Sequence, residues 1–261
     1  MPELIKLDLV DLVLAVGLMA IAIGLSAWEK LGLEFNLALA TGRTIIQLAV
    51  LGYILDFIFA VGNAWPYVVL AILAVLLTIT AIITRNRISQ KIPRVLPLVW
   101  GAIAISTVLT LVYTNFLIIQ PDKWYTPRYI IPFAGILLGN AMNAASVAGE
   151  RLVSTINQLS TDIETHLSLG ATPQEAVKQY RKDAIRAAFL PTLNQMMLIG
   201  LVTIPTFTNG QLLGGVSPLD AVSYEILIIF MVAATNLLTT ILITQALYRQ
   251  FFNSHAQLIS H

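Results

Sequence analysis

The chain contains no cysteine and few charged residues. With no Cys in 261 residues, the sequence excludes disulfides, thiolate metal sites and a catalytic thiol. Only 11% of the residues are charged and 57% are hydrophobic, which is outside the range of a soluble globular domain. The cationic residues form no pooled patch, so we expect no nucleic-acid partner. The composition indicates an all-α, polytopic membrane protein.

The sequence also lacks the motifs of intramembrane proteases and of P-loop ATPases. It contains neither H-E-x-x-H nor G-x-x-x-x-G-K-[ST], and no paired intramembrane aspartates. The three histidines, His166, His255 and His261, do not have the spacing of a ligand set, so the sequence does not identify the residues of a metal site. We therefore expect that the chain is not an enzyme, holds no cofactor of its own, and uses ATP only through a partner.

Long apolar runs predict seven transmembrane helices. About 20 apolar residues are needed to cross roughly 30 Å of hydrocarbon. We expect the chain to form one permease domain, residues 1–261, in contact with the lipid bilayer. The predicted spans are Leu9 to Leu25, Phe35 to Phe59, Trp65 to Thr84, Val95 to Ile119, Tyr129 to Gly149, Leu190 to Thr206 and Ile226 to Leu247.

The distribution of Lys and Arg predicts the orientation. Cationic loops stay on the cytoplasmic side, and most cations fall between spans three and four, between spans five and six, and after span seven. This predicts an outside N-terminus and a cytoplasmic C-terminus in the inner or plasma membrane. The cations on the cytoplasmic side are Lys30, Arg85, Arg87, Lys91, Arg94, Arg151, Lys178, Arg181, Lys182, Arg186 and Arg249, against Lys6, Lys123 and Arg128 outside.

Between spans five and six, residues 150–189 predict a cytoplasmic helical hairpin. Its first half keeps helical period through Leu152, Ile156, Leu159, Ile163 and Leu167. Gly170 supplies a helix stop. Thr172, Pro173 and Glu175 then have the pattern of an N-cap, a first-turn proline and a capping box. The same pattern at Ser217, Pro218 and Asp220 predicts that span seven begins before the hydrocarbon.

Several polar residues fall inside the predicted spans. Arg43, with Gln47 one turn further along span two, either snorkels to the headgroups or has a pairing or pathway role. Asp56 and Glu225 lie close to the outer interface, where we expect solvent to stabilise them. Span six carries Asn194, Gln195, Met196 and Met197; its methionines are typical of packing more than of a soft metal site.

Span five combines a polar stripe with small residues. Asn140, Asn143, Ser146 and Glu150 are spaced three, three and four apart, so they share one face. Gly135 and Gly139, followed by Ala141, Ala145 and Gly149, have the spacing that lets helix backbones approach closely. Two interpretations stay open, a packed helix or subunit interface and a translocation path, and both hold if the path runs between subunits.

Four motifs in this order, GNAMNAASVAGERL, ETHLSLGATPQEAV, LPTLNQMMLIGLVTIP and GQLLGGVSPLDAV, resemble the FetB-type ABC transporter permeases, a family of iron exporters related to plant aluminium-tolerance permeases. The resemblance runs from about Arg43 to about Gln245. It implies a homodimeric permease that pairs with two copies of a separate ATP-binding-cassette ATPase, which binds ATP and Mg, and that exports iron or another metal ion. The ATPase-coupling residues that it implies are Glu164, Gly170, Ala171, Thr172, Pro173 and Glu175, although Thr165 and His166 depart from the E-A-A-x-x-x-G pattern.

Three further functions stay open on the sequence. Plant relatives of the family point to a nucleotide sugar as an alternative substrate. A secondary transporter would use Arg43 and the span-five stripe without ATP, although no inverted repeat is visible. A membrane scaffold would use the hairpin only as a docking arm.

Overall fold

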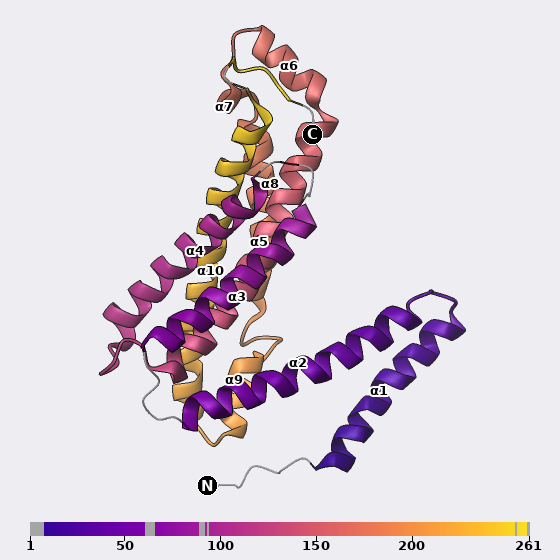
Figure 1. Ribbon diagram of the computed structural model, residues 1–261, viewed down its shortest axis with the longest axis vertical. Coiled ribbons are helices and arrows are strands. Elements are labelled where there is room, and N and C mark those ends of the chain that lie inside the picture. Colours follow the sequence, from indigo (N-terminus) through magenta and orange to yellow (C-terminus); the bar gives the residue numbers. More distant parts are fainter. Residues whose placement is uncertain (1–7, 61–65, 89–91, 93, 254, 260–261) are drawn as a thin grey trace. The chain divides into compact units, whose positions relative to one another are not determined.

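The computed structural model describes residues 8–60, 66–88, 92, 94–253 and 255–259, and within these ranges the chain is all-α with two isolated β-bridges and no strand (Figure 1). Lys6, Lys91, His261 and Trp65, on which parts of the sequence argument rest, lie outside the described residues. The helices are α1 (Leu9–Trp28), α2 (Glu34–Ala60), α3 (Pro66–Ile88), α4 (Val95–Tyr113), the π-helix η1 (Thr114–Ile119), α5 (Pro127–Gln158), α6 (Ser160–Ser168), α7 (Pro173–Ala176), α8 (Lys178–Leu198), α9 (Thr206–Leu213), α10 (Pro218–Tyr248) and the 3₁₀ turn η2 (Arg249–Phe251).

Six helical segments of the described chain are long and apolar enough to cross a membrane: α1, α2, α3, α4 with η1, α5, and α10 with η2. Large apolar side chains on these helices are exposed in the single chain, as in Leu14, Ile46 and Leu109. Lipid covers such side chains without leaving backbone polar groups unpaired, because these segments are helical. The chain is therefore a multi-pass membrane protein.

The segment predicted as span six, Leu190 to Thr206, is not one helix. Helix α8 ends at Leu198, the chain turns at Gly200 with φ +78°, and α9 begins at Thr206. The first half of α8 carries Lys178, Arg181 and Arg186, so the whole helix does not reach the apolar content of the other spans. Seven spans and the orientation of the termini stay predictions.

The described residues divide into two compact units. One holds residues 8–60 and 213–215, and the other holds residues 66–212 and 216–259 with the gaps given above. In the first unit, Ser26 Oγ donates to Glu34 Oε1 at 2.9 Å and accepts from Leu33 N at 3.3 Å, which closes the turn between α1 and α2. A single domain over residues 1–261 stays a prediction.

The core of the second unit is built around α5 and α10, which pack on each other and on α3, α4 and α8. Ala141, Ala145 and Ala148 on α5 are fully buried. At Gly149 the Ile88 side chain of α3 lies directly against α5: a Cβ there would lie 2.5 Å from Ile88 Cδ1. The small residues of the GNAMNAASVAGERL stretch thus allow close packing within one chain, as small residues do in membrane helices.

A line of hydroxyl groups joins α4 to α10. Ser106 and Thr239 share a hydrogen bond, and Thr235 Oγ1 donates to Thr110 Oγ1 at 2.9 Å. All four side chains are buried. Hydroxyl pairs of this kind hold membrane helices together where apolar surface provides little drive for association. We call this contact the hydroxyl seam.

Candidate functional site

The hairpin predicted between spans five and six forms the candidate site. Helix α5 continues to Gln158, and α6 follows after Leu159, so the first arm bends before its tip. At roughly 1.5 Å per residue, the 32 residues of α5 extend about 48 Å, well beyond the roughly 30 Å of a hydrocarbon core. The end of α5 and the short helices α6 and α7 that follow it therefore lie outside the hydrocarbon.

The tip is a tight turn closed by backbone hydrogen bonds. Gly170 has φ +94°, a conformation that side chains with a Cβ rarely adopt, and the predicted helix stop is confirmed. Gly170 N donates to Leu167 O at 3.0 Å and Ala171 N donates to His166 O at 3.1 Å. Both bonds satisfy carbonyl groups at the end of α6.

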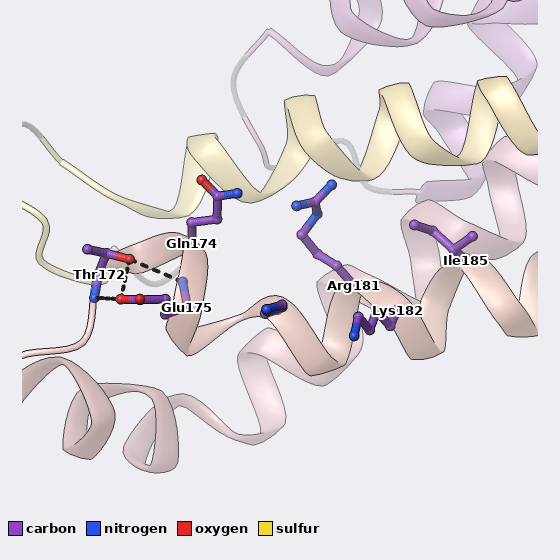
Figure 2. A pocket seen from close by; sticks show the side chains of 7 residues that line it. Thr172, Gln174, Glu175, Arg181, Lys182 and Ile185 are labelled. Carbon is purple, nitrogen blue, oxygen red and sulfur yellow. Dashed lines mark hydrogen bonds between the residues drawn. The ribbon is translucent and has the colours of Figure 1, made fainter.

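The second arm begins with the predicted capping box, which is confirmed (Figure 2). Glu175 N donates to Thr172 Oγ1 at 3.3 Å, while Thr172 N and Thr172 Oγ1 donate to Glu175 Oε2 at 2.9 Å and 2.7 Å. The hydrogen bond from the Thr172 hydroxyl, followed by that from its backbone N–H, holds the pKa of Glu175 below its usual range. The tip is thus fixed on both sides by local bonds.

Below the tip the two arms are joined by polar and apolar contacts. Tyr180 Oη of α8 donates to Asp162 Oδ2 of α6 at 2.6 Å, and this bond is the main cause that raises the pKa of Tyr180 to about 12. Ile163 and Val177 are fully buried in the same core as Phe251 beyond α10. The arms are therefore attached to the end of α10.

A polar groove of about 430 Å³ runs along α7 and the first turns of α8 (Figure 2). Its walls carry Lys178, Arg181 and Lys182 against the single acid Glu175, which is engaged in the capping box. Figure 2 shows Arg181 reaching toward the yellow ribbon of α10. There its guanidinium lies 5.0 Å from the centroid of the Tyr248 ring, a cation–π contact.

Arg181 has no carboxylate partner within the described ranges. Its Nε is buried and makes no hydrogen bond, and burial is the main cause that lowers its pKa. The ion pair found there joins Arg186 and Asp183 at 3.9 Å, and both side chains are exposed. The groove therefore carries uncompensated positive charge beside the capped tip. We call it the cationic groove.

A second groove, of about 590 Å³, lies on the other arm of the hairpin. Glu164, Leu167 and Ala171 form one wall, and the segment from His255 to Leu258 forms the other. This segment folds back after α10, because Ile259 N donates to Phe251 O at 2.8 Å and Phe252 pairs with Leu258. The tail was not predicted from the sequence, and its contribution to the hairpin was missed.

The polar stripe of α5 is divided between two surroundings. Asn140 Nδ2 and Ser146 Oγ donate to carbonyl groups of their own helix, Ile136 O and Met142 O. Asn143 Oδ1 accepts from Arg87 Nη1 of α3 at 3.0 Å, and Glu150 is exposed. The stripe thus makes contacts within the helix and with α3, and its place in a path or a subunit interface stays a prediction.

Of the other predicted path residues, Arg43 and Gln47 belong to the first unit, and those of α8 belong to the second. Arg43 and Gln47 of α2 are exposed and bond to no part of the described chain. On α8, Asn194, Gln195 and Met197 are exposed and Met196 is half-buried. Their roles in a path or an interface stay predictions.

One expectation is wrong, and two polar contacts were missed. Glu225 is not stabilised by solvent, because it is only 7% exposed and accepts a hydrogen bond from Thr208 Oγ1 at 2.9 Å. Asn236 of α10 is buried, and its Nδ2 donates to Thr192 Oγ1 of α8 at 2.9 Å. No spacing rule singles out these residues, because each pairs with a different helix.

Comparison with known proteins identifies relatives of this chain. The chain is 48% identical to the UPF0014 membrane protein slr1647 of Synechocystis over 98% of both chains. It is 35% identical to the probable iron export permease protein FetB of Escherichia coli, covering 95% of this chain and 94% of that protein. It is 32% identical to the protein ALUMINUM SENSITIVE 3 of Arabidopsis thaliana, covering 95% and 88%. No solved structure matches. The model of the uncharacterised protein family UPF0014 matches residues 9–252, and the chain belongs to this family.

Proposed function

We propose that the chain is the permease subunit of an ATP-binding-cassette exporter that moves iron or another metal ion out of the cytoplasm. The chain carries no P-loop motif, so ATP and Mg would bind to a separate ATPase subunit. The complex would contain two copies of the permease and two of the ATPase. The permease itself would catalyse no reaction.

The observation that carries the proposal is the fixed tip of the hairpin. Coupling to a motor requires an element that protrudes from the membrane and transmits a movement without bending. The turn at Gly170 and the capping box of Thr172 and Glu175 meet this need, because local hydrogen bonds fix both of its sides. Glu164, Ala171 and Pro173 lie beside this turn and would share the contact with the ATPase.

The cationic groove supports a protein partner for this end of the chain. Half-buried positive charge without an acid lowers the stability of a free surface, and an acidic segment of the ATPase would compensate it. Movement of the tip would then pass into α5 and α8, which pack on each other and on α10. These three helices would tilt together and open the path.

The names of two relatives support an exported metal ion. One is named a probable iron export permease and another an aluminium-sensitivity protein. The described residues contain no group of three or more His, Cys, Asp or Glu side chains that could hold a metal ion. A transported ion would therefore be bound weakly, through amide, hydroxyl and single carboxylate groups, which suits release on the far side.

The experiment is reconstitution of the purified permease with candidate cassette ATPases. We expect one ATPase to co-purify with the permease. Its rate of ATP hydrolysis in the reconstituted vesicles should be higher with ferrous iron than with a nucleotide sugar. Stimulation by the sugar alone would overturn the metal substrate. Ferrous iron transport without any ATPase would overturn the coupling to ATP.

Two glycine variants test the tip. Gly170→Val forces a β-branched residue into φ +94° and should abolish the stimulated hydrolysis. Gly101→Ala is the matched control, because a Cβ there meets nothing within 4 Å. Normal stimulation in Gly170→Val, with the hairpin still folded, would contradict the role of the tip.

A further inference from the structure

The tail has little regular secondary structure, yet local hydrogen bonds fix its shape. Asn253 Oδ1 accepts from His255 N and Gln257 N, both at 2.9 Å, and Asn253 Nδ2 donates to Gln257 Oε1 at 2.8 Å. Phe252 and Leu258, on either side of this turn, are half-buried against the core beneath the hairpin. A surface that is already ordered loses less conformational entropy when it binds a partner.

The tip of the hairpin lies between two grooves. Ala171 lines the groove beside the tail, and Thr172, the next residue, lines the cationic groove. Figure 1 shows the tail, in yellow, alongside α6. Because these two lining residues are neighbours in the chain, a protein that covers the turn at Gly170 also meets a wall of both grooves.

The two grooves differ in charge. The cationic groove carries three cations, and its one acid is held in the capping box. The groove beside the tail contains one acid, Glu164, whose side chain is exposed and makes no ion pair or hydrogen bond within the described part of the chain. The other ionisable group that lines it is His255. A partner with an acidic segment on one side and a basic segment on the other would therefore fit the tip in one orientation.

We propose that the tail is part of the docking surface for the cassette ATPase, and that a basic segment of the ATPase lies between α6 and the tail. This docking rests on the proposed function, which supplies the ATPase as the partner. A Lys or Arg of the basic segment pairs with Glu164, while an acidic segment lies in the cationic groove on the other side of the tip. Since the tail follows α10 and η2 in the chain, movement of the ATPase also reaches α10 through the tail.

Cysteine protection tests the tail separately from the tip, because the chain has no native cysteine. Ala256→Cys places a thiol on the tail, Leu169→Cys on the tip and Asn157→Cys on α5, all at exposed positions. The co-purifying ATPase is added to each variant in lipid nanodiscs, and alkylation by a maleimide is followed by mass spectrometry. With the ATPase at about ten times its Kd, about a tenth of the permease stays free, so alkylation of Ala256→Cys and Leu169→Cys should slow about tenfold. Alkylation of the control Asn157→Cys should keep its rate.

The tail and the tip can fail independently in this experiment. Protection of Leu169→Cys without protection of Ala256→Cys overturns the role of the tail and leaves the proposed docking at the tip intact. Protection of neither variant by a bound ATPase overturns docking at the tip, and the role of the tail with it. Equal slowing of Asn157→Cys would show general shielding and likewise contradicts a contact at the tail.

Charge variants of Glu164 test the basic segment. Glu164→Lys should weaken ATPase binding about tenfold and the neutral variant Glu164→Gln about threefold, because the first adds repulsion to the loss of the pair. Titration calorimetry measures both affinities. Wild-type affinity in both variants overturns the basic segment.

Discussion

The two ends of α10 each hold an ionisable side chain that has no partner of opposite charge in the described chain. At Tyr248, the Arg181 guanidinium lies on the ring without a carboxylate partner, and at Glu225 a buried carboxyl group has no cation. The two positions are roughly 34 Å apart along the helix at about 1.5 Å per residue. The difference between them is access to water: the cationic groove is open, so its charge can attract a partner, whereas the Glu225 carboxyl group is closed off from water and is bonded to Thr208.

The largest effect is expected from reversing charge at the hairpin end. Arg181→Glu combined with Lys182→Glu should weaken binding of the ATPase on the order of 100-fold, because two cations are replaced by acids in the groove. Titration calorimetry with the purified ATPase measures the change. Glu225→Gln, at the other end, should leave this affinity unaltered.

The matched control is Arg186→Gln on the same helix. Its pair with Asp183 is exposed, so its loss should change the affinity about twofold or less. Equal effects of Arg186→Gln and of the double reversal would show that net charge, and not the groove, determines binding.

The scaffold that connects the two ends can be disturbed at the α3–α5 contact. Gly149→Ala places a Cβ 2.5 Å from Ile88 Cδ1 and should destabilise the fold by about 2 kcal/mol through overpacking. The shift of the thermal unfolding midpoint in detergent measures it. Addition of Ile88→Ala should restore most of the loss; an unrelieved double variant would contradict the contact.

At the far end, Thr208→Val removes the hydrogen bond to Glu225 without changing the shape of the side chain. The loss leaves the buried carboxyl group without this donor, so the cost should be about 1 to 3 kcal/mol. A thermal unfolding series with Thr208→Val, Glu225→Gln and the double variant measures the coupling between the two side chains. An additive double variant would contradict the bond.

The smallest effect is expected at Tyr180. Its pKa of about 12 lies above the usual 10, so the bond to Asp162 stabilises the hairpin fully below pH 10 and is lost as the pH rises through about 12. Tyr180→Phe should cost about 0.5 kcal/mol. Phenolate absorbance should show one tyrosine fewer ionising near pH 12 in this variant; an unchanged titration would contradict the bond.

The sequence predicts the elements that depend on local chemistry. The apolar runs of α1 to α5 and α10, the stop at Gly170, and the caps at Thr172 and Ser217 are all confirmed, because each rests on neighbouring residues. The break after Leu198 was not predicted, because the run Leu198 to Ile204 is apolar enough to continue a span.

Contacts between distant helices could not be predicted in the same way. Arg181 and Tyr248, Asn143 and Arg87, and Thr208 and Glu225 are far apart in the sequence, and each pair meets only when the helices are packed. The hairpin of the candidate site was thus predictable as an element. Its cationic groove and the tail beside it were not.

The hydroxyl groups of the seam between α4 and α10 have alternative hydrogen-bond partners in their own helices. Ser106 and Thr110 of α4 each also donate to a carbonyl group one turn back in their own helix, Ala102 O and Ser106 O. The partner hydroxyls on α10 can turn to their own backbone in the same way. Parting the helices would leave none of these four hydroxyl groups unpaired in the hydrocarbon, so the seam can open and close reversibly.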